Sequence, residues 1–177
     1  MVVNNIMSIW RPRLYVGTYR KYNSGNLDGA WFDLSDYETK ADFIKACYEY
    51  HKDEEDPELM FQDYDDMHAD MYSECCVDDD LFELVAWVNR NENVDYEMVH
   101  AYVNVLEWDA QRIMSEIEDA YYGKYKSEED FAHENFAIDG NVPSYIVNYL
   151  DWDSIAHDMF IDDYVYDNET GCVFATY

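Results

Sequence analysis

The sequence predicts an elongated α+β protein with three small domains in series: a mixed β/α N-terminal domain, a central helical domain and an α+β C-terminal domain. Apolar and polar side chains alternate near both ends of the chain, as in strands, whereas the middle has helical periodicity. The formal net charge is −29 over 177 residues, and like charges oppose a compact shape. Apolar residues make up 49% and aromatic residues 18%, so the chain is expected to fold despite this charge.

The N-terminal domain is expected over residues 13–72, after an additional arm formed by residues 1–12. Residues 13–19 (RLYVGTY) and 30–34 (AWFDL) alternate in polarity and predict two strands. The segment between them, residues 21–29, is rich in Asn and Gly and predicts a loop.

A helix over residues 37–51 is expected to follow the second strand. Ser35 and Asp36 are suitable capping residues, and an apolar stripe with helical spacing runs along the segment. Pro57 comes next, and residues 59–64 predict a third strand.

A central helical domain is expected over residues 73–119. Three consecutive acids, which favour the positive end of a helix dipole, precede the apolar segment LFELVAWV. Residues 89–93 (NRNEN) interrupt this helix, a second helix follows, and a third begins near Asp109.

The C-terminal domain is expected over residues 120–177. Ser127 begins a capping box before a helix, and Pro143 suits the first position of the next helical segment. The remaining expected elements are a strand at 121–126, one or two helices over 144–160, and a hairpin of strands 161–166 and 172–177 around DNETG.

The acidic residues are unevenly distributed. Residues 53–70 contain nine carboxylates and no Lys or Arg, and the chain has no Lys or Arg after Lys126. Because the acids continue through periodic segments, they are expected to line folded elements rather than a solvated tail. This charge makes DNA, RNA and anionic membranes poor partners and favours a cationic partner.

Motifs for catalysis or metal binding do not emerge. A calcium loop starting at Asp63 fails at its fifth and sixth positions, where Met67 and His68 replace an oxygen ligand and a Gly. The sequence lacks phosphate-loop, nucleophile-elbow and zinc-protease motifs. We therefore expect neither an enzyme nor a metal or cofactor. The four cysteines lack zinc-site spacing, and the start lacks the apolar core of a signal peptide, which favours reduced thiols and a cytoplasmic location.

One hypothesis for the charge is that carboxylates replace DNA phosphates. Duplex DNA carries one charge per about 1.7 Å, so this chain matches about 50 Å of duplex and a dimer about 100 Å. The alternatives are halophilic or solubility-driven acidity, an acidic binding protein for another cationic partner such as a nucleoid protein or DNA enzyme, and a calcium-dependent or hydrolytic enzyme. The phosphate-mimic surface is predicted to include Asp53, Glu54, Glu55, Asp56, Asp63, Asp65, Asp66, Asp70, Asp78, Asp79, Asp80, Glu107, Asp109, Glu116, Glu118 and Asp119.

Two segments resemble a known family. Residues 13–34, with KYN followed by GAWF, and residues 142–166, VPSYIVNYLDWDSIAHDMFIDDYVY, are similar to the opening and closing regions of the ArdA-type antirestriction proteins. The resemblance implies a three-domain DNA mimic that dimerises through its third domain. It also implies inhibition of type I restriction–modification enzymes by filling the DNA channel of the methyltransferase core, with no single catalytic residue.

A homodimer is also favoured by the residues near the C-terminus. The segment 143–166 has more aromatic surface than a small domain needs to bury, and aromatic enrichment is typical of interface cores. The predicted interface residues are Pro143, Tyr145, Ile146, Tyr149, Trp152 and Phe160. Because each subunit is strongly acidic, association is expected to weaken at low salt.

Overall fold

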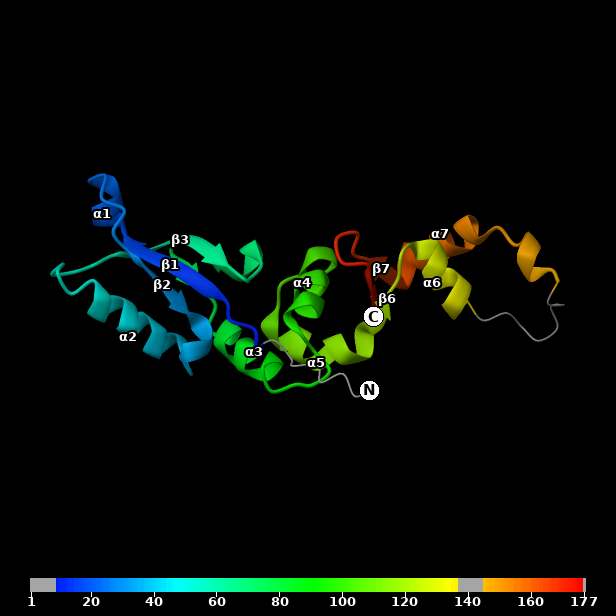
Figure 1. Ribbon diagram of the computed structural model, residues 1–177, viewed down its shortest axis with the longest axis horizontal. Helices are drawn as coiled ribbons and strands as arrows, with labels where there is room; N and C mark the ends of the chain where they lie inside the picture. Colours follow the sequence, from blue (N-terminus) through cyan, green and yellow to red (C-terminus); the bar gives the residue numbers. More distant parts are fainter. Residues whose placement is uncertain (1–8, 137–144, 177) are drawn as a thin grey trace, which may run out of the picture.

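The structure, a computed structural model, describes residues 9–136 and 145–176. The fold is mixed α+β, with seven α-helices and three small sheets in the described residues. In Figure 1 the elements follow one another along the long axis, from the first sheet through a helical region to the last sheet and its helices.

The first sheet has the order β2-β1-β3, and both pairings are antiparallel. It consists of β1 (Arg13–Thr18), β2 (Ala30–Asp33) and β3 (Leu59–Asp65), so the three predicted strands are confirmed. Leu14 and Val16 of β1 are buried, and helix α2 (Lys40–Tyr50) lies along the sheet in Figure 1.

Two local predictions in this region are wrong. The predicted loop contains a short helix, α1 (Tyr19–Asn23), because the Thr18 hydroxyl accepts the Lys21 N–H and caps it. Helix α2 begins later than expected, since Ser35 and Asp36 lie in a 3₁₀ turn, η1 (Leu34–Asp36), and Thr39 is the cap. The Thr39 hydroxyl accepts the Asp42 N–H at 3.2 Å.

The predicted helical region is confirmed as α3 (Asp80–Val88), α4 (Tyr96–Val105) and α5 (Ala110–Ala120). A small hairpin precedes it, formed by β4 (Tyr72–Ser73) and β5 (Cys76–Val77) after the 3₁₀ turn η2 (Ala69–Met71). The hairpin was not predicted, because two-residue strands leave no alternating pattern to detect.

The last sheet has the order β6-β8-β7, and the predicted hairpin is confirmed as the antiparallel pair of β7 (Tyr164–Tyr166) and β8 (Cys172–Ala175). Ser127 caps α6, as expected. Pro143 lies outside the described residues. The other elements here are β6 (Tyr121–Lys124), α6 (Glu128–Asn135), the 3₁₀ turn η3 (Val147–Tyr149) and α7 (Trp152–Asp162).

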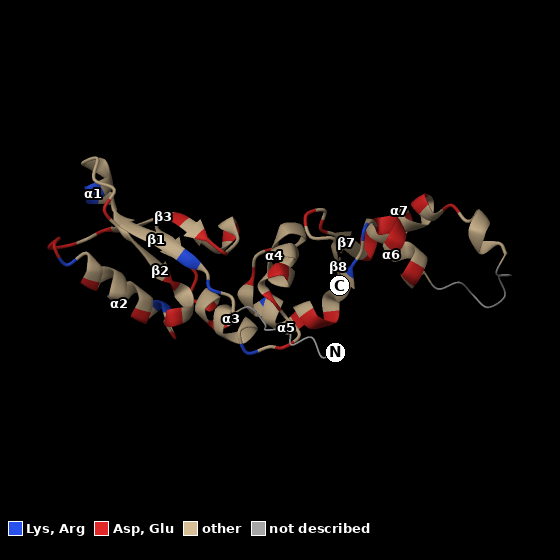
Figure 2. Ribbon diagram, viewed as in Figure 1, with Lys and Arg blue, Asp and Glu red and all other residues tan. Residues whose placement is uncertain are grey.

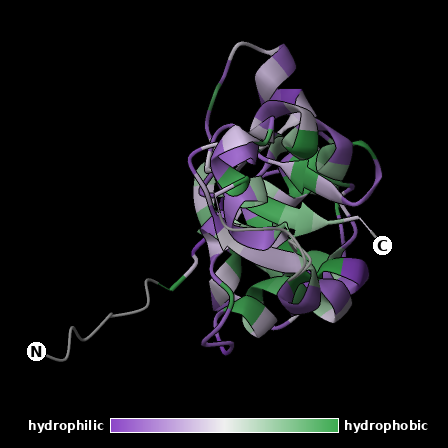
Figure 3. Cartoon of the chain, turned by 90° about the vertical axis from the view of Figure 1, so that its right-hand side faces the viewer, coloured by the Kyte–Doolittle hydropathy of each residue, from purple (hydrophilic) through white to green (hydrophobic). Residues whose placement is uncertain are grey.

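One hydrophobic core extends from Trp10 to Phe174 and includes side chains from the first sheet, from α3 to α5 and from the last sheet. A smaller cluster around Ala132, Trp152 and Ala156 joins α6 to α7. Seen end-on in Figure 3, apolar and hydrophilic segments alternate around the body of the chain. The regions therefore share a core, and the predicted domain boundaries stay a prediction.

Part of the predicted N-terminal arm belongs to the fold. Trp10 and Pro12 are buried, and the Pro12 carbonyl accepts the Leu34 N–H at 2.8 Å. None of the helices in the described part of the chain combines the length and the apolar composition that a membrane span requires.

Asp167 is the one buried carboxylate among the described residues, and it organises the β7–β8 turn. Its carboxylate accepts the Thr170 hydroxyl at 2.6 Å, the Thr170 N–H at 3.0 Å and the Asn104 side-chain N–H at 3.3 Å. Burial by itself raises the pKa of Asp167, but these hydrogen bonds outweigh it and the pKa is lowered.

We expect Asp167→Asn to lower the free energy of unfolding by about 1–3 kcal/mol at neutral pH, because the amide nitrogen cannot accept these hydrogen bonds. A lowered carboxyl pKa stabilises the fold above the pKa of the unfolded chain, about 3.9, and this contribution is lost as pH falls through the folded value. The difference between variant and parent should therefore shrink below about pH 4 in urea unfolding. The exposed Asp163→Asn serves as a control, and equal stability of both variants would contradict the expectation.

Candidate functional site: an acidic surface

The predicted phosphate-mimic carboxylates are almost all at the surface. Glu54, Asp80 and Glu116 are half-buried, and the others in the predicted set are exposed. Figure 2 shows Asp and Glu along the full length of the molecule, with Lys and Arg at few positions. The acids are therefore displayed on folded elements, as the periodic segments had indicated.

The predicted carboxylates fall into four groups along the chain. The first lies in the turn between α2 and β3, the second on β3 and the segment after it, the third at the start of α3, and the fourth around α5. The groups are, in order, Asp53, Glu54, Glu55 and Asp56; Asp63, Asp65, Asp66 and Asp70; Asp78, Asp79 and Asp80; and Glu107, Asp109, Glu116, Glu118 and Asp119.

Most of the basic side chains make ion pairs within the molecule. Arg11 contacts Asp33 at 2.7 Å, and Lys40 contacts Asp79 at 3.0 Å. The other pairs between a Lys or Arg and a carboxylate in the described residues are Arg11–Asp36, Arg13–Asp65, Lys21–Asp28, Lys21–Asp53, Lys52–Glu49, Arg112–Glu116 and Lys124–Glu97. Few cations in the described residues are therefore available to oppose an approaching cationic partner.

Lys21 joins α1 to the first acidic group. Its ammonium donates to Asp28 at 2.9 Å, to Asp53 at 3.1 Å and to Nδ1 of His51 at 3.2 Å. Nε2 of the fully buried His51 must donate to the Val16 carbonyl, so Nδ1 is the acceptor. The hydrogen bond from Lys21 lowers the pKa of Asp53, and Lys21 thereby fixes the start of the turn that carries Glu55 and Asp56.

We expect Lys21→Met to lower the free energy of unfolding by about 1–3 kcal/mol, because it leaves Nδ1 of the buried His51 without a donor. Lys45→Met, which removes an exposed lysine of α2, is the matched control and should change stability by less than about 0.5 kcal/mol. Chemical unfolding of both variants checks this, and equal effects would show that the buried network adds no stability.

Several acids have a structural role that the sequence analysis did not assign to them. Asp95, Asp109 and Asp151 cap α4, α5 and α7, where the side chain of each accepts the backbone N–H three residues on. The hydrogen bonds from Ser154 lower the pKa of Asp151. Carboxylates at helix N-termini interact favourably with the dipole, which helps a highly acidic chain to fold.

The C-terminal region carries further exposed acids that the predicted set omitted. They lie on or directly beside α6 and α7, and the absence of Lys and Arg after Lys126 was the signal for them. They are Glu128, Glu129, Asp130, Glu134, Asp151, Asp153, Asp158, Asp162 and Asp163. The acidic surface therefore continues to the far end of the molecule.

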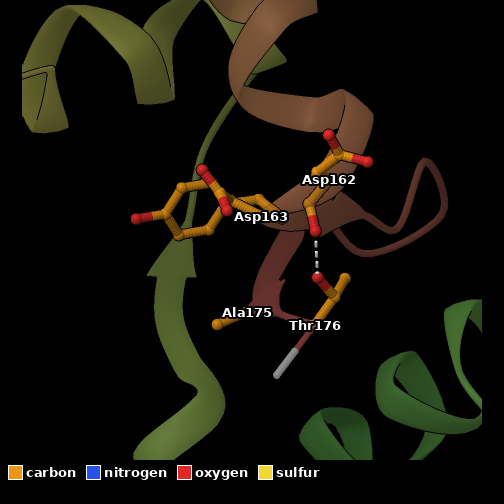
Figure 4. Close-up of a pocket in the computed structure, with 5 residues that line it drawn as sticks. Asp162, Asp163, Ala175 and Thr176 are labelled. Atoms are coloured by element: carbon orange, nitrogen blue, oxygen red, sulfur yellow. Dashed lines mark hydrogen bonds between the residues drawn. The ribbon is translucent and has the colours of Figure 1, made fainter.

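The pocket in Figure 4 lies where α7 meets the last sheet. Its lining includes Asp162, Asp163 and Thr176, and the Thr176 hydroxyl donates to the Asp162 carbonyl. Because this hydrogen bond uses the backbone carbonyl of Asp162, the Asp162 carboxylate stays exposed as part of the acidic surface. Within residues 9–136 and 145–176, no cluster of three His, Cys, Asp or Glu has the geometry of a metal site.

The predicted dimer residues divide into two sets. Tyr149 is 85% exposed, Tyr145 68% and Ile146 36%, so they offer apolar surface to a partner. Trp152 is only 8% exposed and stacks on His133, with ring centroids 3.9 Å apart. Phe160 contacts Phe131, with ring centroids 5.3 Å apart. Trp152 and Phe160 therefore pack within the region that contains α6 and α7.

These features define a folded acidic protein whose surface favours cationic partners. The model of a family described as antirestriction protein (ArdA) matches residues 14–174, and the chain belongs to this family. It is thus a member of a family of inhibitors directed against restriction enzymes, as the resemblance at both ends of the chain had indicated. A comparison with curated proteins finds no match.

Proposed function

We propose that this antirestriction protein is a mimic of B-form DNA that occupies the DNA-binding channel of type I restriction–modification enzymes. The observation that carries the proposal is the display of exposed carboxylates on elements from the α2–β3 turn to α7, while most cations are paired internally. A channel that binds DNA is lined with cations for phosphates, and it would attract this surface.

The arrangement of the elements supports an elongated three-domain shape with the first domain at one end and the C-terminal domain at the other (Figure 1). The exposed Tyr145, Ile146 and Tyr149 support a homodimer that joins through the C-terminal domain. In that arrangement the acidic surfaces of the two subunits would form one continuous surface. Its charge would match that of about 100 Å of duplex DNA, a length that suits the channel of a large enzyme. No catalysis is required, because occupancy of the channel excludes DNA.

The experiment is a cleavage assay of unmodified DNA with a purified type I enzyme and increasing amounts of this protein. We expect protection at stoichiometric amounts relative to the enzyme. Cleavage by a type II endonuclease, which lacks the type I methyltransferase core, should be inhibited far less. Protection that requires a large excess, or that is equal for both enzymes, would instead support a general acidic binding protein for cationic partners.

A further inference from the structure

We propose that Trp10 and Asn89 form a latch that holds the first sheet at a fixed angle to α3 and α4. In this role they are positioning residues for the acidic surface. The proposal rests on the proposed DNA mimicry for its functional consequence, whereas its structural content can be tested separately.

The latch consists of reciprocal hydrogen bonds and one stacked pair of rings. The Trp10 N–H donates to Oδ1 of Asn89 at 2.7 Å, and Nδ2 of Asn89 donates to the Trp10 carbonyl at 2.9 Å. The Trp10 ring, 2% exposed, stacks on Tyr96 at 5.0 Å between centroids and 12° between planes. Asn89 ends α3 and Tyr96 begins α4, so Trp10 contacts both helices.

The same segment fixes the end of β3. The indole N–H of Trp10 donates to the Asp66 carbonyl at 2.6 Å, and the Arg11 N–H donates to the Asp66 carboxylate at 3.3 Å. Asp66 has a φ of 56°, a left-handed conformation that is uncommon for residues other than glycine and needs support from its surroundings. Trp10 therefore holds the backbone of Asp66, and the adjacent Arg11 N–H holds its carboxylate, which belongs to the predicted phosphate-mimic surface.

A second contact joins the first sheet region to the helices on other elements. Phe43 of α2 and Phe82 of α3 lie 5.6 Å apart between ring centroids, and both are buried. The Lys40–Asp79 ion pair at 3.0 Å also joins α2 to the start of α3, and the Trp10 contacts, which lie on a different element from α2, add a further constraint on rotation between the sheet and the helices. Trp10 precedes residues 14–174, the region that matches the family, whereas its partners Asn89 and Tyr96 lie within that region.

A fixed angle matters because a mimic binds through many weak contacts that must form together. When geometry forbids simultaneous engagement, the gain from multiple contacts is lost although each contact is unchanged. Loosening the latch should therefore weaken inhibition without any change in net charge.

The test combines a distance measurement with an inhibition assay. Spin labels at Cys75, with Cys76→Ser, and at Asn168→Cys report on the two sides of the latch. Cys47 and Cys172 are buried, and burial raises the pKa of Cys47 to about 12, so neither should be labelled. The variants are Trp10→Ala and Asn89→Ala, and the control is Trp31→Ala, which removes a 44% exposed tryptophan from β2.

We expect both latch variants to broaden the distance distribution and to raise the inhibition constant about tenfold, while Trp31→Ala leaves the distribution unchanged. Asn89→Ala removes only the reciprocal hydrogen bonds, so it keeps the test valid if Trp10→Ala does not fold. An unchanged distribution in the folded latch variants would overturn the latch. A broadened distribution with full inhibition would overturn its positioning role, and full inhibition by variants that lack surface carboxylates would instead refute the DNA mimicry.

Discussion

Neutralising a block of exposed carboxylates should weaken inhibition of a type I enzyme by about two to three orders of magnitude. The block is Glu55→Gln, Asp56→Asn, Asp63→Asn, Asp78→Asn and Glu107→Gln, which are exposed and make no ion pair with a Lys or Arg in the described residues. Each exposed charge pair contributes only about 0–1 kcal/mol, so single substitutions should change the inhibition constant less than about fivefold. Several such terms act together, and the field of the whole surface also speeds encounter.

A charge-neutral control separates carboxylates from general damage. Lys52→Gln with Glu49→Gln removes an ion pair of 2.6 Å outside the predicted phosphate-mimic set and leaves the net charge unchanged, so inhibition should stay within about twofold of the parent. The block variant should unfold at a temperature no lower than the parent, because fewer like charges repel one another. Full inhibition by the block variant, together with loss of inhibition from one single substitution, would point to a discrete binding pocket.

The second large effect is expected at the proposed dimer interface. Tyr145→Ser with Tyr149→Ser should raise the dissociation constant of the dimer about a thousandfold, because truncation of a buried interface tyrosine costs about 2 kcal/mol. Tyr22→Ser with Tyr48→Ser, which changes two tyrosines of similar chemistry that are 49% and 48% exposed in the first sheet region, is the matched control.

Sedimentation equilibrium measures this effect. The parent should be dimeric at micromolar concentration in moderate salt, and lower salt should weaken association because the −29 charge of each subunit is screened less. A parent that stays monomeric in moderate salt, or a double variant that dimerises like the parent, would contradict the interface.

The elements that the sequence predicts well are those with long periodic patterns. Leu81, Leu84, Val85 and Val88 are all buried on α3, as their spacing indicated. Short elements were missed, because α1 has only five residues and lies in a segment rich in Asn and Gly. The choice of Thr39 rather than Ser35 as the cap of α2 depends on the 3₁₀ turn before it, which has no clear sequence signal.

The sequence predicts that most acidic side chains are exposed, but it does not predict which residues they contact. Exposure follows from the charge itself, whereas the contact of Lys21 with Asp53 joins residues 32 positions apart and depends on the folded chain. Trp10 was placed in an arm because one aromatic residue in a short segment has no periodicity. Its contact with Asn89, 79 positions away, appears only in three dimensions.

The proposed DNA mimicry requires that this protein and DNA compete for one channel. The most direct measurement is equilibrium binding of the protein to a type I methyltransferase core at increasing concentrations of a duplex that contains the recognition sequence. We expect the apparent dissociation constant of the protein to rise in proportion to the duplex concentration, with no ternary complex. An apparent dissociation constant that stays constant at saturating duplex, with DNA and protein bound to the same core, would contradict it.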